Sequence, residues 1–360
     1  MKKVLAFLVS LMLLASLGVG YAAEAEAQNL LIGVSIRSLD NEYFVFVVDG
    51  INAFAEQLRK ARPDLNVEVQ VLLCEYSNDQ QINDINALIA KGGKNTIIYC
   101  DPNDTSICAT IAEICEEAGV YWGTTWSLQE DVYPTDYERY VYYQTPGIEE
   151  SMEELCLDLF ASFQKPNEGK ILAVQGNMAT TAGVARFAGL ERALEKTPGV
   201  ELLAAQDCNF EVAATQAAIT TWLSMYDFDE IDAVWVDNDE NAIAAIEVLT
   251  SYGYAGKVVT TGFDGTSTAA AAIKAGSMFG TVCSNAQLQG GLGASYLYAA
   301  WNGDVDLKQV PASERMFYTV TSVINPENID AYISDYIEAG APDIDWLDYK
   351  QLILSEYPVE

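Results

Sequence analysis

Two short polar segments in the second half of the chain have the composition of ligand-binding loops. Asn238 lies within the segment Val236–Glu240, and Asp264 lies within the segment Gly262–Thr266. Each segment follows an apolar run of strand length and precedes an alanine-rich pattern typical of a helix. Because ligands bind at the carboxyl ends of parallel strands, we expect both side chains to bond to a ligand in one cleft. The alternative is that Asn238 and Asp264 only cap the helices that follow them.

The composition excludes several kinds of chemistry. The chain has 360 residues and no histidine, so it cannot build a histidine-based catalytic triad or metal site. Its formal net charge of -33 opposes binding to nucleic acid and to anionic lipid. None of the seven cysteines forms a Cys-x-x-Cys pair, and Cys108 and Cys115 lie too far apart on one predicted helix to bridge. We therefore expect buried free thiols, no metal, no cofactor and no nucleic-acid partner.

The amino terminus predicts export. Lys2 and Lys3 precede an apolar run over residues 4–17, and small residues follow as far as Ala27. This is the pattern of a secretory signal peptide, which we expect to occupy residues 1–27. A retained membrane anchor is the alternative, but the apolar run is short for a bilayer span. No cysteine lies near the predicted cleavage region, so we expect a protein of the periplasm or cell exterior without a lipid anchor.

Strand and helix patterns alternate along the rest of the chain. The first predicted strands are Leu30–Ile36, Val67–Leu73, Thr96–Cys100 and Tyr121–Thr125, with helical patterns between them. A polar, tyrosine-rich stretch at Leu128–Tyr143 breaks the alternation, which then resumes. Such alternation predicts parallel sheets with helices on both faces. The expected fold class is α/β, with two doubly wound parallel-sheet lobes joined by a hinge and separated by a cleft.

The break in the alternation sets the expected domain boundaries. We expect an N-terminal lobe of residues 28–127 plus 286–311 and a C-terminal lobe of residues 128–285 plus 312–330. The remaining tail, residues 331–360, is rich in aromatic residues, including Trp346 and Tyr349. Because such residues favour burial, we expect the tail to pack on one lobe.

Several motifs carry a family resemblance between Leu30 and Tyr332. In chain order they are Ser38-x-x-Asn41-x-Tyr43-Phe44, Asp101-Pro102, Arg186-x-x-Gly189, Phe210, Asn238-Asp239-Glu240, Gly262-Phe263-Asp264-Gly265 and Gly280-Thr281-Val282. Together they resemble the sugar-binding periplasmic proteins of the ribose and galactose type, the receptors of ABC importers. The resemblance implies the type I periplasmic-binding fold and a sugar held in the cleft between the lobes.

The resemblance also implies the residues that contact the sugar. A sugar ring has apolar C–H faces and a rim of hydroxyls, so it needs aromatic planes and polar groups. The implied ligand-binding residues are Asn41, Tyr43, Phe44, Arg186, Phe210, Asn238, Asp264 and Ser284. The alternatives are that Tyr43, Phe44 and Phe210 only pack in the core, and that Arg186 lies on the surface.

Trp126-Ser127 departs from the family pattern. Many relatives place an acid here, often followed by arginine, whereas this chain offers an indole and a small hydroxyl. We therefore expect Trp126 to bind the ligand as a stacking surface, and we do not carry over ribose as the ligand. The alternative is a structural role for Trp126 near the hinge. Lys165–Gly169 also lacks the ligands of the calcium loop in galactose-type relatives, which agrees with the expectation of no metal.

The expected function is that of an exported, monomeric, non-enzymatic solute-binding protein. It would capture a sugar or sugar-like ligand and deliver it to the membrane permease of an ABC importer. One alternative is a sensor that presents its ligand to a receptor kinase. A glycosidase using paired carboxylates is disfavoured because no activated nucleophile stands out. A cage for a quaternary ammonium ligand is disfavoured by Arg186 in the same site.

Overall fold

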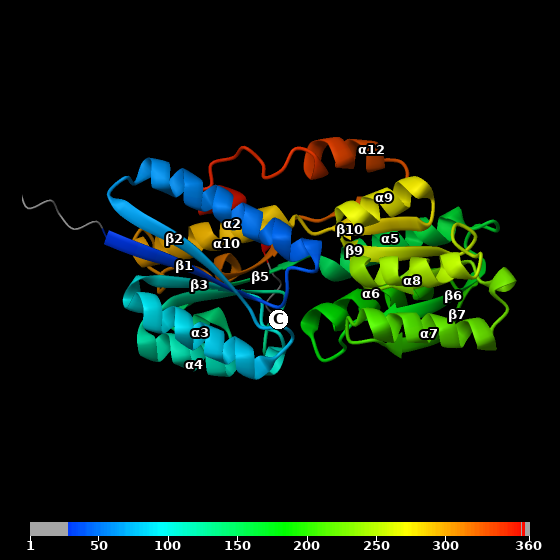
Figure 1. The fold of residues 1–360 in the computed structure, drawn as a ribbon, viewed down its shortest axis with the longest axis horizontal. Coiled ribbons are helices and arrows are strands. Elements are labelled where there is room, and N and C mark those ends of the chain that lie inside the picture. The colour runs from blue at the N-terminus through cyan, green and yellow to red at the C-terminus, as the bar shows by residue number, and fades with distance from the viewer. Residues whose placement is uncertain (1–27, 354, 357–360) are drawn as a thin grey trace, which may run out of the picture.

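The chain forms two α/β lobes that lie side by side in the computed structural model, which describes residues 28–353 and 355–356 (Figure 1). The predicted signal peptide, residues 1–27, lies outside the described residues. The first lobe has a seven-stranded sheet in the order β13-β11-β5-β4-β3-β1-β2, and the second has a six-stranded sheet in the order β12-β10-β9-β8-β6-β7. Pairing is parallel except at the edge strands β12 and β13. The predicted fold class is therefore confirmed.

The first lobe is built mainly from the N-terminal third of the chain. Its strands are β1 (Gln28–Ile36), β2 (Leu65–Leu73), β3 (Thr96–Cys100), β4 (Tyr121–Thr125), β5 (Tyr140–Pro146), β11 (Met316–Thr319) and β13 (Ser355–Glu356). Its helices are α2 (Glu42–Ala61), α3 (Asn78–Gly92), α4 (Cys108–Ala118), α10 (Ala286–Asn302), α11 (Ala312–Arg315) and α13 (Tyr349–Leu352). Helices α2 and α10 pack on one face of the sheet, and α3 and α4 bury a separate core on the other.

The second lobe repeats this layering. Its strands are β6 (Gly169–Gln175), β7 (Val200–Asp207), β8 (Ala233–Val236), β9 (Val259–Asp264), β10 (Met278–Cys283) and β12 (Ser322–Ile324). Its helices are α5 (Ile148–Ser162), α6 (Thr181–Lys196), α7 (Val212–Met225), α8 (Asp239–Ser251), α9 (Ser267–Ala275) and α12 (Ile329–Tyr332), which continues into one π-helical turn, η5 (Ile333–Ile337). Helices α5 and α6 share a core cluster with α2 and α10 of the first lobe, so apolar packing is continuous between the lobes.

The chain crosses between the sheets after β5, after β10, between β11 and β12, and again between β12 and β13. Two predicted boundaries are therefore wrong. Strand β5 was expected in the second lobe but pairs in parallel with β4, and β11 pairs with β5 in the first sheet. The tyrosine-rich sequence of β5 looked polar, yet Tyr140, Tyr142 and Tyr143 are fully buried.

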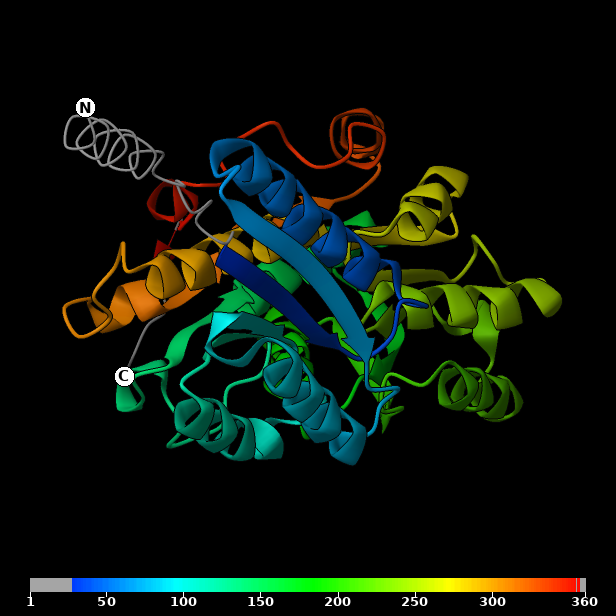
Figure 2. The ribbon, with the colours of Figure 1, turned by 60° about the vertical axis from the view of Figure 1, so that its left-hand side comes forward.

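The C-terminal tail packs on both lobes, whereas packing on one lobe was expected. Tyr332 donates a hydrogen bond from its hydroxyl to the carbonyl of Gly265 in the second lobe. Farther along, Trp346 is buried against Gly291 of α10, where any side chain larger than glycine would clash with the indole. The tail therefore runs from the second lobe back to the first, along the top of Figure 1 and beside α2 in Figure 2.

All seven cysteines are buried and unpaired. Cys74 directly follows β2, and Cys100 is the last residue of β3. Strand β1 lies between these two strands in the sheet. Within the described part of the chain, no cluster of cysteine and acidic side chains has the arrangement of a metal site. Among the helices between residues 28 and 356 that the structure describes, none is long and apolar enough to cross a membrane.

The packing of the tail gives a first prediction. Trp346→Ala should lower the free energy of unfolding by about 3–5 kcal/mol, because it removes a large buried side chain and leaves a cavity over α10. Thermal denaturation followed by circular dichroism would measure the loss. Met225→Ala is the control, because Met225 is 63% exposed and its truncation should change stability little. Equal melting temperatures for the two variants would show that the tail does not stabilise the first lobe.

Candidate functional site

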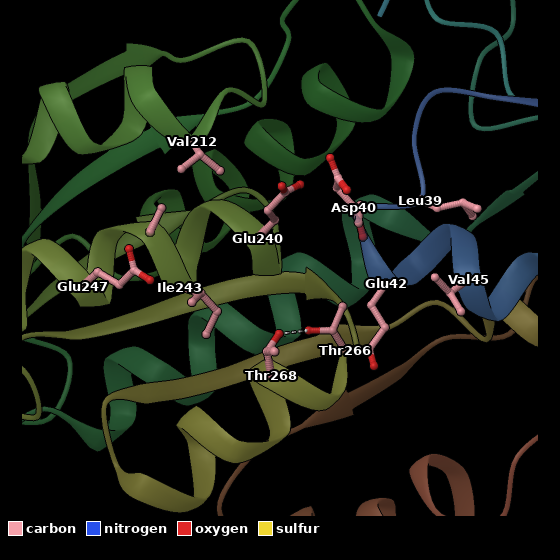
Figure 3. Close-up of a pocket in the computed structure, with 12 residues that line it drawn as sticks. Leu39, Asp40, Glu42, Val45, Val212, Glu240, Ile243, Glu247, Thr266 and Thr268 are labelled. Carbon is pink, nitrogen blue, oxygen red and sulfur yellow. Dashed lines mark hydrogen bonds between the residues drawn. The ribbon is translucent and has the colours of Figure 1, made fainter. Parts of the chain in front are cut away.

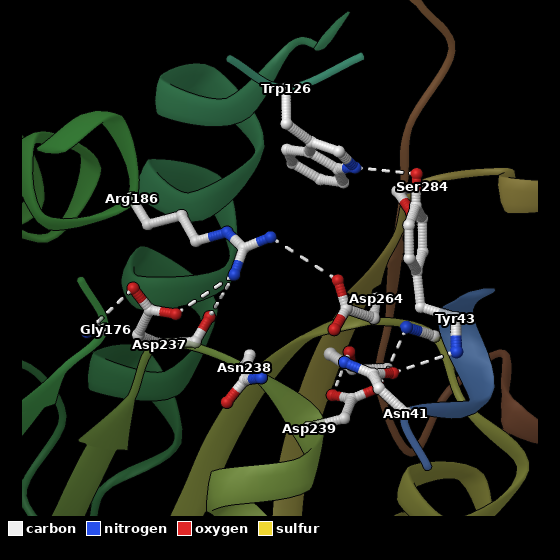
Figure 4. A network of polar contacts seen from close by, with 12 residues as sticks. Asn41, Tyr43, Trp126, Gly176, Arg186, Asp237, Asn238, Asp239, Asp264 and Ser284 are labelled. Carbon is white, nitrogen blue, oxygen red and sulfur yellow. Dashed lines mark hydrogen bonds and ion pairs between the residues drawn. The ribbon is translucent and has the colours of Figure 1, made fainter. Parts of the chain in front are cut away.

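Side chains that follow the carboxyl ends of strands in both sheets line one cleft between the lobes, and several of them are drawn in Figure 4. The cleft is lined from the first lobe by Arg37, Asn41, Tyr43, Phe44, Tyr76, Asp101 and Trp126. It is lined from the second lobe by Ala182, Arg186, Phe210, Asn238, Glu240 and Asp264. All predicted ligand-binding residues except Ser284 are therefore brought together in one cleft.

Arg186 lies at the centre of the second-lobe wall, on the second turn of α6. Its Nη1 donates to Asp237 Oδ1 over 3.0 Å, and its Nη2 lies 3.4 Å from Asp264 Oδ1. The side chain is 4% exposed, so the alternative of a surface arginine is wrong. Gly189 allows this placement, because a Cβ there would come within 2.7 Å of the Glu149 carbonyl on α5.

Aromatic rings surround the guanidinium of Arg186. Its central carbon lies 4.3 Å from the ring centroid of Phe263, 4.8 Å from that of Trp126 and 5.9 Å from that of Phe210. These distances are within the range of cation–π attraction. Trp126 belongs to the first lobe, so the contact connects the two walls of the cleft. Phe263 was not predicted as a site residue.

Hydrogen bonds hold Trp126 in place from the first lobe. Its indole Nε1 donates to the Tyr43 hydroxyl over 2.6 Å, and that hydroxyl donates to Gln289 Oε1 on α10 over 2.7 Å. Tyr43 and the neighbouring Phe44 are buried and also line the cleft. The two aromatic residues thus belong to the core and to the cleft wall at once.

Four residues that line the cleft adopt an unusual backbone conformation. Tyr76, Trp126, Phe210 and Asp264 have positive φ angles of 61°, 64°, 58° and 121°. Such angles are strained for residues other than glycine and concentrate at functional sites. Gly176 makes room for this geometry beside the cleft, because a Cβ there would come within 2.2 Å of the Phe210 ring.

Asn238 and Asp264 differ in how they use their side chains. Asn238 caps α8, since its Oδ1 accepts a hydrogen bond from the Asn241 amide over 3.2 Å, and it also lines the cleft. Asp264 caps no helix, because Thr266 caps α9 instead. The alternative that these residues only cap helices is therefore wrong for Asp264. For Asn238 it describes one of two positions, because Asn238 caps α8 and also lines the cleft.

Burial controls the protonation of the acids around the cleft. It raises the pKa of Asp264 to about 8, against the lowering effect of Arg186, and raises the pKa of Asp101 to about 6. Burial also raises the pKa of Asp237 above its usual value, against the lowering effect of Arg186. Asp239, whose pKa burial raises to about 6, accepts hydrogen bonds from the amides of Gly265 and Thr266 over 2.8 Å each. Asp239 therefore fixes the loop that carries Asp264.

Ser284 is not among the residues that line the cleft, and its ligand-binding role stays a prediction. It is fully buried where the chain leaves β10 for the first lobe, and its carbonyl accepts a hydrogen bond from Gln289. Its hydroxyl finds no hydrogen-bond partner among the described residues.

Several lining residues were not predicted as part of the site: Arg37, Tyr76, Asp101, Ala182 and Glu240. Arg37 and Asp101 immediately follow β1 and β3, so the strand-end rule that found Asn238 would also have found them. Tyr76 and Ala182 carry no comparable signal in the sequence.

The lobes touch each other on both sides of the cleft. The Glu42 carboxylate of α2 accepts hydrogen bonds from the Ser267 amide (2.6 Å) and hydroxyl (2.7 Å) at the start of α9. On the other side, the Thr105 hydroxyl donates to the Ala179 carbonyl over 2.9 Å. The cleft has about 40 Å³ of free space, against about 300–1,000 Å³ for small-molecule sites. It is therefore nearly closed.

A larger pocket of about 390 Å³ adjoins the cleft on its outer side (Figure 3). The two spaces share Asn41 and Glu240 in their walls. The outer pocket lies between the start of α2 and helices α8 and α9, and Glu42 borders it.

The raised pKa values give a prediction about pH. Because the pKa of Asp264 rises from 3.8 to about 8 on folding, its contribution to stability is full below pH 3.8 and is lost as pH rises through about 8. The melting temperature of the free protein should therefore fall between pH 4 and pH 8. Asp264→Asn should make that fall smaller, while the exposed Asp335→Asn should leave it unchanged. Parallel profiles for wild type and Asp264→Asn would contradict the raised pKa.

Comparison with known proteins places the chain in a family. It matches the periplasmic binding protein domain over residues 32–304. The putative rhizopine-binding protein of Rhizobium meliloti is 24% identical over 323 residues, which cover 86% of this chain and 94% of that protein.

Two solved structures have the same fold. A twin-arginine translocation pathway signal protein from Burkholderia phytofirmans is 29% identical, with a TM-score of 0.84 over 92% of this chain and 99% of that one. An ABC transporter solute binding protein from Bacillus halodurans C-125 with bound myo-inositol is 24% identical, with a TM-score of 0.70 over 87% of this chain and 100% of that one. The resemblance predicted from the sequence is confirmed. The chain belongs to the periplasmic binding protein domain family, whose members are solute-binding proteins and not enzymes.

Proposed function

We propose that the protein captures a sugar or a sugar-like cyclic polyol in the cleft and delivers it to the membrane permease of an ABC importer. The observation that carries the proposal is the buried guanidinium of Arg186, held by carboxylates and framed by aromatic rings where two lobes meet. The bound myo-inositol of the Bacillus halodurans protein is a ring of the proposed kind.

The chemistry of the walls suits such a ring. Trp126 and Phe210 offer apolar faces for the C–H groups of the ligand. Arg186 offers a hydrogen-bond donor, because its Nε is buried and has no partner among the described residues. Asp264 accepts hydrogen bonds from hydroxyls when ionised, and below its raised pKa of about 8 the protonated carboxyl also donates one. A polyol can therefore satisfy both kinds of polar group and cover the rings.

Binding requires the lobes to move. A cleft with about 40 Å³ of free space cannot admit a sugar ring while the lobes are in contact. The ligand enters when the contacts at Glu42 and Thr105 are broken, and the lobes then close over it. Hinge closure of this kind gives a permease a liganded form that differs from the free protein.

A thermal-shift screen against monosaccharides and cyclic polyols tests the proposal. Because a ligand that binds only the folded state stabilises it, at least one compound should raise the melting temperature in a concentration-dependent way. If no member of the panel raises the melting temperature at millimolar concentration, the proposed ligand class is wrong.

With a ligand from that screen, Arg186→Ala and Asp264→Ala should each weaken binding by about 100- to 1,000-fold. The closed cleft would leave the abandoned hydroxyls of the ligand without partners and without water. Titration calorimetry measures the affinities. Arg192→Ala, on the same helix but 40% exposed at its side chain, should bind like wild type. Near-native affinity in both cleft variants would remove these residues from the site.

A further inference from the structure

A carboxylate on the first-lobe side of the cleft has no hydrogen-bond partner. Asp101 lines the cleft and is 0% exposed. Neither of its carboxylate oxygens accepts a hydrogen bond from any residue that the structure describes. Arg37 Nη1 forms an ion pair with Oδ2 at 3.5 Å, which balances charge but makes no hydrogen bond. A buried carboxylate with unfilled acceptor sites is unfavourable, so a partner is expected from within the cleft.

The position of Asp101 is fixed by its backbone. Its amide donates to the Ser35 carbonyl over 3.0 Å, which extends the pairing of β3 with β1. Its carbonyl accepts a hydrogen bond from Gln81 Nε2 of α3 over 2.9 Å. Arg37 is fixed as well, because its Nη2 donates to the Pro102 carbonyl over 3.1 Å. The carboxylate is thus held on a rigid base, as a ligand-binding group requires.

Asp101 and Arg186 offer complementary groups from opposite lobes. Asp101 supplies two free acceptors, and Arg186 supplies one free donor at Nε. The charge of Arg186 lowers the pKa of Asp101, against the larger effect of burial, so the two groups interact across the cleft. A molecule between them must donate hydrogen bonds to the first lobe and accept one from the second.

We propose that Asp101 is a ligand-binding residue that accepts hydrogen bonds from two neighbouring hydroxyls of the ligand and thereby determines which rings are bound. The inference rests on the proposed function, since it names the residue that would bind two hydroxyls of the same polyol. A polyol with adjacent hydroxyls fits because each hydroxyl donates one hydrogen to one carboxylate oxygen. A ring that lacks either hydroxyl leaves a buried acceptor unfilled and is rejected.

A purely structural role for Asp101 makes a different prediction. If the carboxylate only balances the charge of Arg37, its removal lowers the melting temperature of the free protein and leaves discrimination among ligands unchanged. A ligand-binding role changes discrimination, which a stability defect alone does not do.

The test measures affinities by calorimetry for a ligand from the screen and for its monodeoxy analogues. We expect Asp101→Asn to weaken binding of the parent ligand by about 10- to 100-fold. Wild type should bind analogues that lack one of the two hydroxyls far more weakly than it binds the parent ligand. Asp101→Asn should bind the same analogues with nearly the affinity that it has for the parent ligand. Asp84→Asn is the matched control, because Asp84 is also buried in the first lobe with an unpartnered Oδ2 but lies outside the cleft.

Three results would overturn the inference. The first is an Asp101→Asn variant that binds within twofold of wild type, and the second is an equal penalty for every deoxy analogue in both proteins. If Asp101→Asn does not fold, a crystal structure of wild type with the bound ligand decides the question. The third result is a structure in which no hydroxyl of the ligand lies within hydrogen-bond distance of Asp101. If wild type binds no compound of the panel, the proposed function fails and the inference fails with it. If wild type binds a compound and Asp101→Asn binds it with the same affinity, only the inference about Asp101 fails and the proposed function stands.

Discussion

The positive charge of Arg186 is buried between the lobes, and the surrounding residues are arranged to compensate for it. A buried charge without partners is strongly unfavourable, whereas one with well-placed counter-charges and hydrogen bonds is tolerated. Asp237 supplies the shorter ion pair and is itself held by the amide of Gly176 over 3.0 Å. Asp264 supplies the longer pair and lies at the cleft surface. Arg186 is therefore held more closely by Asp237 than by Asp264, which is the one of the two that lines the cleft and which we propose bonds to a ligand hydroxyl.

The same charge couples the cleft to the crossings between the lobes. Trp126 contacts the guanidinium and is held by Tyr43, which is held by Gln289. Gln289 in turn donates to the carbonyl of Ser284 at the crossing after β10, and its own carbonyl accepts from Gln144 near the crossing after β5. A hydrogen-bonded chain therefore joins the wall of the proposed binding site to two of the crossings between the lobes.

Local patterns in the sequence predicted much of this arrangement. The alternation of strand and helix gives two doubly wound sheets, and the strand-end rule places Asn238 and Asp264 at the cleft. The partners that complete the site depend on tertiary packing, which local patterns do not encode. Phe263 points from β9 to the guanidinium, and nothing in its apolar strand distinguishes it from a core residue. Strand β5 was missed because buried tyrosines resemble a polar linker, and the two-lobe path of the tail depends on Gly291 leaving room for Trp346.

We propose that closure of the two lobes around Arg186 encloses the ligand. Small-angle X-ray scattering of the free and the ligand-saturated protein tests it most directly. Because a ring cannot enter while the lobes touch, we expect the free protein in solution to sample more open forms than the liganded one. We expect the radius of gyration to fall on saturation. A scattering profile that does not change at saturation would mean that the ligand binds a rigid pocket, and the closure account would be wrong.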